Sequence, residues 1–176
     1  MPSAQRLTPQ YTIEDYEQWQ GDWELWDGTP VSMSPSPSKR HQRTAKRLLY
    51  MLEHALGEQT DCQCEVFYEI DWRVKDDTVL RPDLLIECEP ADTKWVESTP
   101  TLVVEILSPG TAKNDQFYKR GRYAQYGVGY YLIVDPIAES IESLHLIDGQ
   151  YQPIDPTKLK LGEGCSISLD TSAIWS

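Results

Sequence analysis

The stretch "LVVEILSPG", from Leu102 to Gly110, places one carboxylate, Glu105, inside an otherwise apolar run. A short apolar run bounded by turn-forming residues is typical of a strand that is buried on both faces. An ionised side chain in such a strand costs free energy unless it pairs with another charge or holds a metal ion. The run therefore predicts a central strand in which Glu105 pairs with an opposite charge or holds a metal ion.

Two helices are expected outside this strand. The first begins after Ser38, which can cap it, and ends at Gly57; the second covers residues 111–126 and ends before Gly127. The apolar stripe of the first helix has helical spacing and consists of Ala45, Leu48, Leu49, Leu52, Ala55 and Leu56. A shorter helix is expected within residues 8–19.

Further strands complete a mixed α/β pattern. They are expected over residues 64–74, 80–88, 128–136 and 165–169. Hairpins are expected around Asp27-Gly28 and Asp148-Gly149, because Asp-Gly pairs favour tight turns.

Length and charge limit the class of protein. A chain of 176 residues suits one domain, residues 1–176, with residues 1–20 as an N-terminal helical extension. The net charge of −12 argues against coating nucleic acid by bulk charge and against binding an anionic membrane surface. The first ten residues have no apolar stretch of signal-peptide length, and the apolar run Tyr130–Val134 is too short to span a bilayer. We therefore expect a cytoplasmic protein with no membrane partner.

The four cysteines are sparse, and only Cys62 and Cys64 lie close together in the sequence. No second Cys or His pair follows at the spacing of a zinc site. We expect four reduced thiols, with a metal clip formed by Cys62 and Cys64 as the alternative.

Asp83 is the expected partner site for Glu105. It follows Pro82 at the start of one predicted strand, while Glu105 lies in the next, so pairing of the two strands would bring both carboxylates together. Two carboxylates that share a site repel each other unless a proton or cation lies between them. A hard ion such as Mg²⁺ binds oxygen ligands, and the Ile106 carbonyl can add one more. Asp83 could instead only cap a turn.

"RPD" followed by "VVEIL" resembles the PD-(D/E)xK nuclease pattern. The wider phrases "WELWDGTPVSMSPSPSKRH", "RPDLLI", "LVVEILSPGTAKNDQFYKRGRYAQYGVGYYLIVDP" and "LIDGQY" resemble the Uma-two-type family of restriction endonucleases. The resemblance covers nearly the whole chain. It implies a restriction-endonuclease-like α/β fold, in which helices flank a central mixed β-sheet with added hairpins.

One position departs from the nuclease pattern. The pattern has a lysine two residues after the Glu, where this chain has Leu107. That lysine is expected to orient or deprotonate the attacking water. The family resemblance implies that Lys119 on the following helix replaces it, with Lys113 as the second candidate. Alternatively, Lys119 could form only a surface ion pair with Asp115, at the i, i+4 spacing.

The resemblance also implies a third carboxylate near the metal, Glu24, and a substrate contact or site-edge residue, His41. Arg40 and Arg43 belong to a locally basic run on the first helix and could contact phosphates. Each has a plainer interpretation: hairpin polarity for Glu24, a surface position at a helix start for His41, and a solvated helix face for the arginines.

These features favour Mg²⁺-dependent hydrolysis of phosphodiester bonds by an endonuclease that acts on DNA, with Mn²⁺ as a second suitable ion. A homodimer is expected, because two active sites are needed to cut both strands. A catalytically inactive binding or regulatory module of the same fold is the alternative, favoured by the charge of −12 and by Leu107. A hydrolase of smaller phosphate esters would suit the acidity, but the chain has no phosphate-cradling loop.

Overall fold

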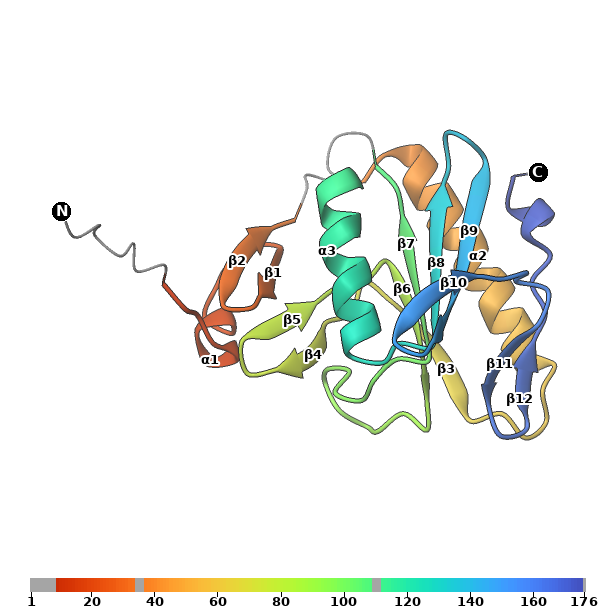
Figure 1. The fold of residues 1–176 in the computed structure, drawn as a ribbon, viewed down its shortest axis with the longest axis horizontal. Helices are drawn as coiled ribbons and strands as arrows, with labels where there is room; N and C mark the ends of the chain where they lie inside the picture. The colour runs from red at the N-terminus through yellow and green to blue at the C-terminus, as the bar shows by residue number, and fades with distance from the viewer. Residues whose placement is uncertain (1–8, 34–36, 109–111, 176) are drawn as a thin grey trace.

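A computed structural model describes residues 9–33, 37–108 and 112–175, without the side chains of residues 112–116. Its centre is a sheet of six strands (Figure 1). In spatial order these are β10 (Gln150–Pro153), β9 (Ser140–Ile147), β8 (Tyr130–Asp135), β7 (Leu102–Ile106), β6 (Leu84–Cys88) and β3 (Cys64–Tyr68). Only β7 and β8 pair in parallel, and they are joined by α3 (Ala112–Gln125). The expected central mixed sheet is confirmed.

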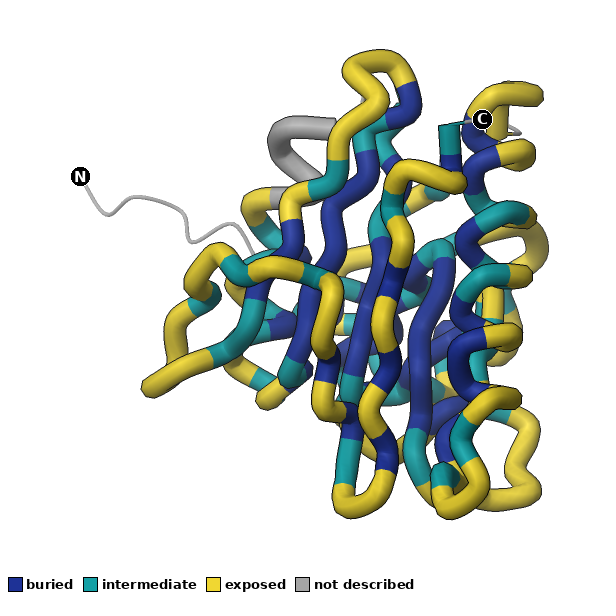
Figure 2. Tube along the Cα trace, turned by 90° about the vertical axis from the view of Figure 1, so that its right-hand side faces the viewer, coloured by how far each residue is buried: buried dark blue, intermediate teal, exposed yellow. Residues whose placement is uncertain are grey.

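Two helices cover opposite sides of this sheet, as Figure 1 shows. The alternate residues Leu102, Val104 and Ile106 of β7 pack in one core cluster with α2 (Lys39–Gly57). Val103 packs in a second cluster with Tyr123 of α3. Figure 2 shows buried residues along the central strands and exposed residues at the loops. Glu105 alternates with the α2-facing residues, so it lies on the α3 side.

A second sheet of four strands lies beside the first (Figure 1). In spatial order it contains β2 (Thr29–Ser32), β1 (Trp23–Trp26), β5 (Thr78–Leu80) and β4 (Trp72–Lys75). The predicted hairpin at Asp27-Gly28 is confirmed as β1 and β2. The N-terminal helix, α1 (Ile13–Tyr16), is shorter than expected and is capped by Thr12.

Two of the expected strands are each divided in two. The prediction of one strand over residues 64–74 is wrong, because Glu69 has a φ of 49° and the chain then leaves β3 for β4. The prediction for residues 80–88 is wrong in the same way. Leu80 ends β5 and Leu84 begins β6, on either side of Pro82, whose missing N–H cannot join a ladder.

The C-terminal segment forms a separate hairpin of β11 (Leu159–Gly162) and β12 (Cys165–Ile167), followed by the 3₁₀ turn η1 (Thr171–Ile174). The sequence predicted β12 but not β11. Within the described ranges, no helix is long and apolar enough to cross a membrane.

The expectation of four reduced thiols is wrong for this structure. Disulfides join Cys62 to Cys165 and Cys64 to Cys88. Cys64 and Cys88 stand directly opposite each other on β3 and β6. Spacing along the chain could not reveal this, because the contact depends on the pairing of distant strands.

Candidate active site

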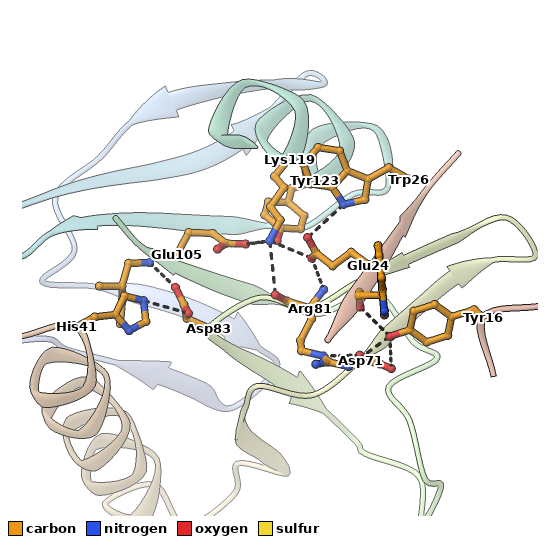
Figure 3. A network of polar contacts seen from close by, with 12 residues as sticks. Tyr16, Glu24, Trp26, His41, Asp71, Arg81, Asp83, Glu105, Lys119 and Tyr123 are labelled. Carbon is orange, nitrogen blue, oxygen red and sulfur yellow. Dashed lines mark hydrogen bonds and ion pairs between the residues drawn. The ribbon is translucent and has the colours of Figure 1, made fainter. Parts of the chain in front are cut away.

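Asp83 and Glu105 meet across two adjacent antiparallel strands. Leu84 pairs with Val104, so Asp83, one residue earlier, stands opposite Glu105. The Asp83 Oδ2 accepts a hydrogen bond of 2.6 Å from the Ile106 N–H, which fixes the carboxylate at this end of the sheet. The two side chains retain 20% and 14% of their exposure, so solvent still reaches the pair. Figure 3 shows both carboxylates at this end of the sheet.

Lys119 reaches the same place from α3 (Figure 3). Its Nζ lies 3.0 Å from Glu105 Oε1 and 3.0 Å from Glu24 Oε1. It also donates a hydrogen bond of 3.5 Å to the Arg81 carbonyl. Lys119 is buried, so the alternative of a surface pair with Asp115 does not describe it; the side chain of Asp115 lies outside the described part. Leu107 packs against the α3-side core.

Glu24 is the third carboxylate of the site and comes from β1. It is buried, and its Oε1 accepts a hydrogen bond of 2.6 Å from the Arg81 N–H. Its Oε2 accepts one of 3.2 Å from the Trp26 indole. Hairpin polarity alone therefore does not account for Glu24, because this side chain points inward and contacts Lys119.

Two residues of the site were missed by the sequence analysis. Tyr123 donates a hydrogen bond of 2.5 Å to Glu105 Oε1. Burial, and to a smaller extent the charge of Glu105, raises the pKa of the Tyr123 phenol, so the phenol keeps its proton. It lies four residues after Lys119, so the i, i+4 spacing on one helix face could have identified it. Arg81 directly precedes the Pro-Asp pair of the nuclease pattern, which was the available signal for it.

The Arg81 side chain is anchored away from the carboxylate cluster. Its Nε lies 2.7 Å from Asp71 Oδ1, and its Nη2 donates to the Tyr16 hydroxyl. Asp71 is buried and also accepts a hydrogen bond of 2.9 Å from Tyr16. Through this anchor the Arg81 backbone is held where its N–H meets Glu24 and its carbonyl meets Lys119.

The surroundings shift the pKa values of both Glu105 and Lys119. Burial raises the pKa of Glu105 to about 7; Lys119 opposes this effect, while the charges of Asp83 and Glu24 add to it. Burial alone would lower the pKa of Lys119, but the adjacent Glu105 and Glu24 raise it above its ordinary value. Lys119 is therefore a permanent cation at neutral pH.

His41 lies at the edge of the cluster, at the start of α2. It is buried, and its Nε2 is 3.3 Å from Asp83 Oδ1. Burial lowers the pKa of His41, but Asp83 and the Ile106 carbonyl raise it, and the net shift is upward. The surface interpretation of His41 is therefore wrong. The residue is buried, and it contacts a carboxylate of the site.

The two predicted substrate-binding arginines do not enter the cluster. Arg40 is exposed and donates to the Pro136 carbonyl, and Arg43 is exposed on α2. Lys113 belongs to α3, but its side chain lies outside the described residues.

The donor set fits a hard divalent cation. Asp83 and Glu105 supply oxygens from facing positions, and the Ile106 carbonyl lies beside His41 at the same strand end. The hydrogen bonds from Lys119 and Tyr123 to Glu105 both fall on Oε1, so Oε2 is the oxygen that would bind a cation. The repulsion between Glu105 and Asp83 would also fall if a cation lay between them.

The chain is similar to known proteins over nearly its whole length. Residues 13–172 match the model of the Uma2 family, described as "Putative restriction endonuclease". An uncharacterized protein of Synechocystis sp. is 29% identical over 178 residues, covering 92% of this chain and 90% of its own.

A solved structure has a similar fold. It is a crystal structure from Anabaena variabilis, titled a "putative nuclease belonging to DUF820", with a TM-score of 0.72 and 13% identity. The match covers 93% of this chain and 97% of that one. The expected restriction-endonuclease-like fold is thereby confirmed.

Proposed function

The chain belongs to the Uma2 family, described as "Putative restriction endonuclease", and from this premise we propose that it is a Mg²⁺-dependent endonuclease that hydrolyses DNA. In the proposed reaction a water oxygen bonds to phosphorus, and the bond from phosphorus to one ester oxygen breaks. The products are a phosphate monoester end and a free hydroxyl. Mn²⁺ is the alternative ion, since it takes the same oxygen ligands.

The contact of Lys119 with Glu105 carries this proposal. The Nζ is 3.0 Å from Glu105 Oε1, although the lysine comes from a helix and not from the strand that holds the glutamate. Leu107, at the strand position that usually has the lysine, is therefore no objection to catalysis. A cation beside the two carboxylates of the pattern is the arrangement that the reaction requires.

Asp83, Glu105 and the Ile106 carbonyl would hold the metal ion. When bound, Mg²⁺ would supply Lewis acidity and neutralise negative charge on the phosphate. Asp83 is prepared for this role by the hydrogen bond from the Ile106 N–H, which fixes its orientation. Protonated His41 would compete with the metal ion for the Asp83 carboxylate, so loss of the His41 proton would favour binding of the metal ion.

Lys119 would orient the attacking water and stabilise charge on the phosphate. Because its pKa is raised, it has no lone pair available at neutral pH and is unsuited to act as the base. Glu24 holds the amine from the opposite side, and Tyr123 holds Glu105 by its hydroxyl. These two residues would position the reacting groups without touching substrate.

The substrate surface is proposed to include the start of α2. Arg40 and Arg43 are exposed there, close in sequence to His41 at the site. Such a local basic patch could contact phosphates in a chain whose net charge is −12. A homodimer would present two sites to the two strands of a duplex.

A non-catalytic module is the second candidate, because a charge of −12 opposes stable binding of nucleic acid. The same cleavage experiment separates the two. Purified protein is incubated with supercoiled plasmid, linear duplex, single-stranded DNA and RNA, in Mg²⁺, Mn²⁺ or EDTA. Cleavage of DNA that needs the metal supports the nuclease, whereas no cleavage of any substrate would leave the binding module.

Two variants identify the activity as that of this protein. Glu105→Ala should abolish cleavage, since it removes a proposed metal ligand. Lys160→Ala changes an exposed lysine on β11 and should leave the rate unchanged. Equal cleavage by the parent and Glu105→Ala would indicate a contaminating nuclease and contradict the proposal.

A further inference from the structure

Four cysteines from distant parts of the chain converge at the edge of the central sheet. Cys64 begins β3 and Cys88 ends β6, and the two face each other across the strand pair. Cys62 lies just before β3, and Cys165 begins β12 of the separate hairpin. All four pack in or against the core cluster on the α2 side of the sheet. They are the entire cysteine content of the chain.

Three of the four sulfur atoms form one group, and the fourth, Cys88 Sγ, is bonded to one of those three. In the structure they are joined as Cys62–Cys165 and Cys64–Cys88. The Sγ atoms of Cys62, Cys64 and Cys165 nevertheless all lie within 4.8 Å of one another, so the two disulfides lie side by side. Two independent cross-links have no need to touch, whereas the ligands of one ion must converge.

The size of the group suits zinc. Zn–S bonds of about 2.3 Å in a tetrahedron place neighbouring sulfurs about 3.8 Å apart. The 4.8 Å spread of the three sulfurs is close to that separation, so small side-chain rotations would suffice. Thiolates are soft ligands that select zinc over Mg²⁺, which distinguishes this group from the carboxylates of the active site.

We propose that, in the reduced protein, Cys62, Cys64, Cys88 and Cys165 bind one Zn²⁺ ion. The two disulfides are the oxidised state of the same site. Two equivalents of a dithiol reductant supply four electrons and four protons, and become two disulfides while the protein gains four thiols. Binding of Zn²⁺ to four thiolates then releases those four protons to solvent.

The site would be structural. Four protein ligands close the tetrahedron and leave no position for a substrate or water. The hairpin of β11 and β12 forms its own two-stranded sheet, without a ladder to the central one among the described residues. A hairpin of this size is marginally stable alone. Zinc would fix it to β3 and β6 through Cys165.

The surroundings favour such a site. Cys64 and Cys165 are buried, which shields the metal, and Cys62 is half-buried, which gives an entry path. The Thr101 hydroxyl lies 3.6 Å from Cys88 Sγ and can donate to a thiolate there. Donors of this kind stabilise the negative charge of a tetrathiolate centre.

Metal content of the full-length protein tests the proposal. The protein is purified without a metal-affinity tag, under inert gas with a phosphine reductant, and then dialysed against EDTA. We expect about one zinc per chain by elemental mass spectrometry. Replacement by Co²⁺ should give the strong visible absorption of tetrahedral cobalt thiolate. The proposal would be overturned if the protein, after zinc has been added, holds less than about a tenth of a zinc per chain and all four of its thiols still react with a thiol reagent.

Variants separate this site from the active site. Cys62→Ser changes the half-buried ligand and should lower zinc affinity about tenfold or more. Glu105→Ala, in the other site, should keep its zinc. Zinc retained by a Cys62→Ser/Cys165→Ser variant, or zinc lost on Glu105→Ala, would place the ion elsewhere. If Cys62→Ser does not fold, the cobalt spectrum of the parent decides alone.

Discussion

Lys119 joins two carboxylates that would otherwise be buried without a cation. Its Nζ is 3.0 Å from Glu24 and 3.0 Å from Glu105, and its side chain is 9% exposed. At such depth a charge and its partners depend on one another, since removal of one leaves the others uncompensated. The same lysine therefore contributes to stability and, in our proposal, to catalysis, and experiments must separate the two.

Lys119→Met should destabilise the protein by about 3–5 kcal/mol, because it leaves Glu24 and Glu105 buried without a counterion. Urea unfolding in EDTA at pH 8 would measure the loss. Adding Glu24→Gln to Lys119→Met should recover part of it, since one uncompensated charge is gone. If the single variant unfolds like the parent, the ion pairs contribute nothing to stability.

Glu105 provides a pH-dependent test. Its folded pKa is raised from 4.5 to about 7, mainly by burial, so ionisation of Glu105 opposes folding. The stability from its neutral form is complete below 4.5 and is lost as pH rises through about 7. A cation bound to the ionised form would restore it. The rise in melting temperature on adding Mg²⁺ should therefore be larger at pH 8 than at pH 5.

Thermal unfolding with and without Mg²⁺ at these two pH values would measure the effect. Glu105→Gln is the matched control, because the amide cannot ionise and should remove most of the difference between pH 5 and pH 8. A Mg²⁺ response that is equal at both pH values in the parent would contradict binding at Glu105.

Sequence reasoning at this scale located the carboxylates but not their supports. An acidic residue in an apolar strand is visible in one dimension, as Glu105 is, and Asp83 follows from strand pairing. The anchoring of Arg81 joins Tyr16 of α1 to the residue before β4, Asp71, and to the residue after β5, Arg81, so no local pattern marks it. Tyr123 was identifiable from its helical spacing to Lys119 but has the appearance of a core aromatic.

At the scale of elements, α3 connects the parallel strands β7 and β8 and carries both Lys119 and Tyr123. The position of this helix therefore sets the position of the lysine. Its sequence contains one helix-weakening residue, Gly121, at which an added Cβ would meet no atom within 4 Å.

Gly121→Ala should stabilise the protein by about 0.5–1 kcal/mol, because alanine loses less backbone entropy than glycine in a helix. The cleavage rate should not change, since Gly121 is exposed and an added Cβ would meet no atom within 4 Å. Gly129→Ala is the contrasting variant: its Cβ would lie 3.2 Å from the Thr101 carbonyl, and we expect it to destabilise. Urea unfolding of both variants measures the difference, and a destabilised Gly121→Ala would show that α3 does not tolerate the methyl group.

The long, periodic elements were predictable and the interruptions were not. The apolar stripe of α2 and the apolar runs of β7 and β8 can be recognised from the composition and spacing of their residues. The change from β3 to β4 depends on a positive φ at Glu69, and glutamate is not a residue type from which a positive φ can be predicted. β11 reads as a polar stretch because only Leu159 and Leu161 face the core.

At the scale of the whole molecule, the charge of −12 opposes the binding of nucleic acid, and in our proposal two local features would overcome it. They are the exposed arginines of α2 and a bound metal ion, which would offset the site carboxylates. A homodimer would bring two such regions to one duplex.

Light scattering after gel filtration should give twice the 20.2 kDa mass of one chain. The reason is that cutting both strands of a duplex calls for two sites in a closed pair. The control is the same measurement over a tenfold dilution, which should not alter the mass of a stable dimer. A monomer that still linearises supercoiled plasmid would contradict the dimer and leave the nuclease intact.

In our proposal, Lys119 on α3 supplies the catalytic cation that is missing from β7. The most direct measurement is the single-turnover rate of DNA cleavage in Mg²⁺ at pH 8, for the parent, Lys119→Met and the exposed-lysine control Lys160→Met, under conditions in which all three are folded. We expect Lys119→Met to lower the rate by about 10²–10³-fold, as for loss of one group that stabilises transition-state charge. Lys160→Met should match the parent. A Lys119→Met protein that cleaves within about twofold of the parent rate would contradict the account, since so small a change lies far below the loss expected for such a group.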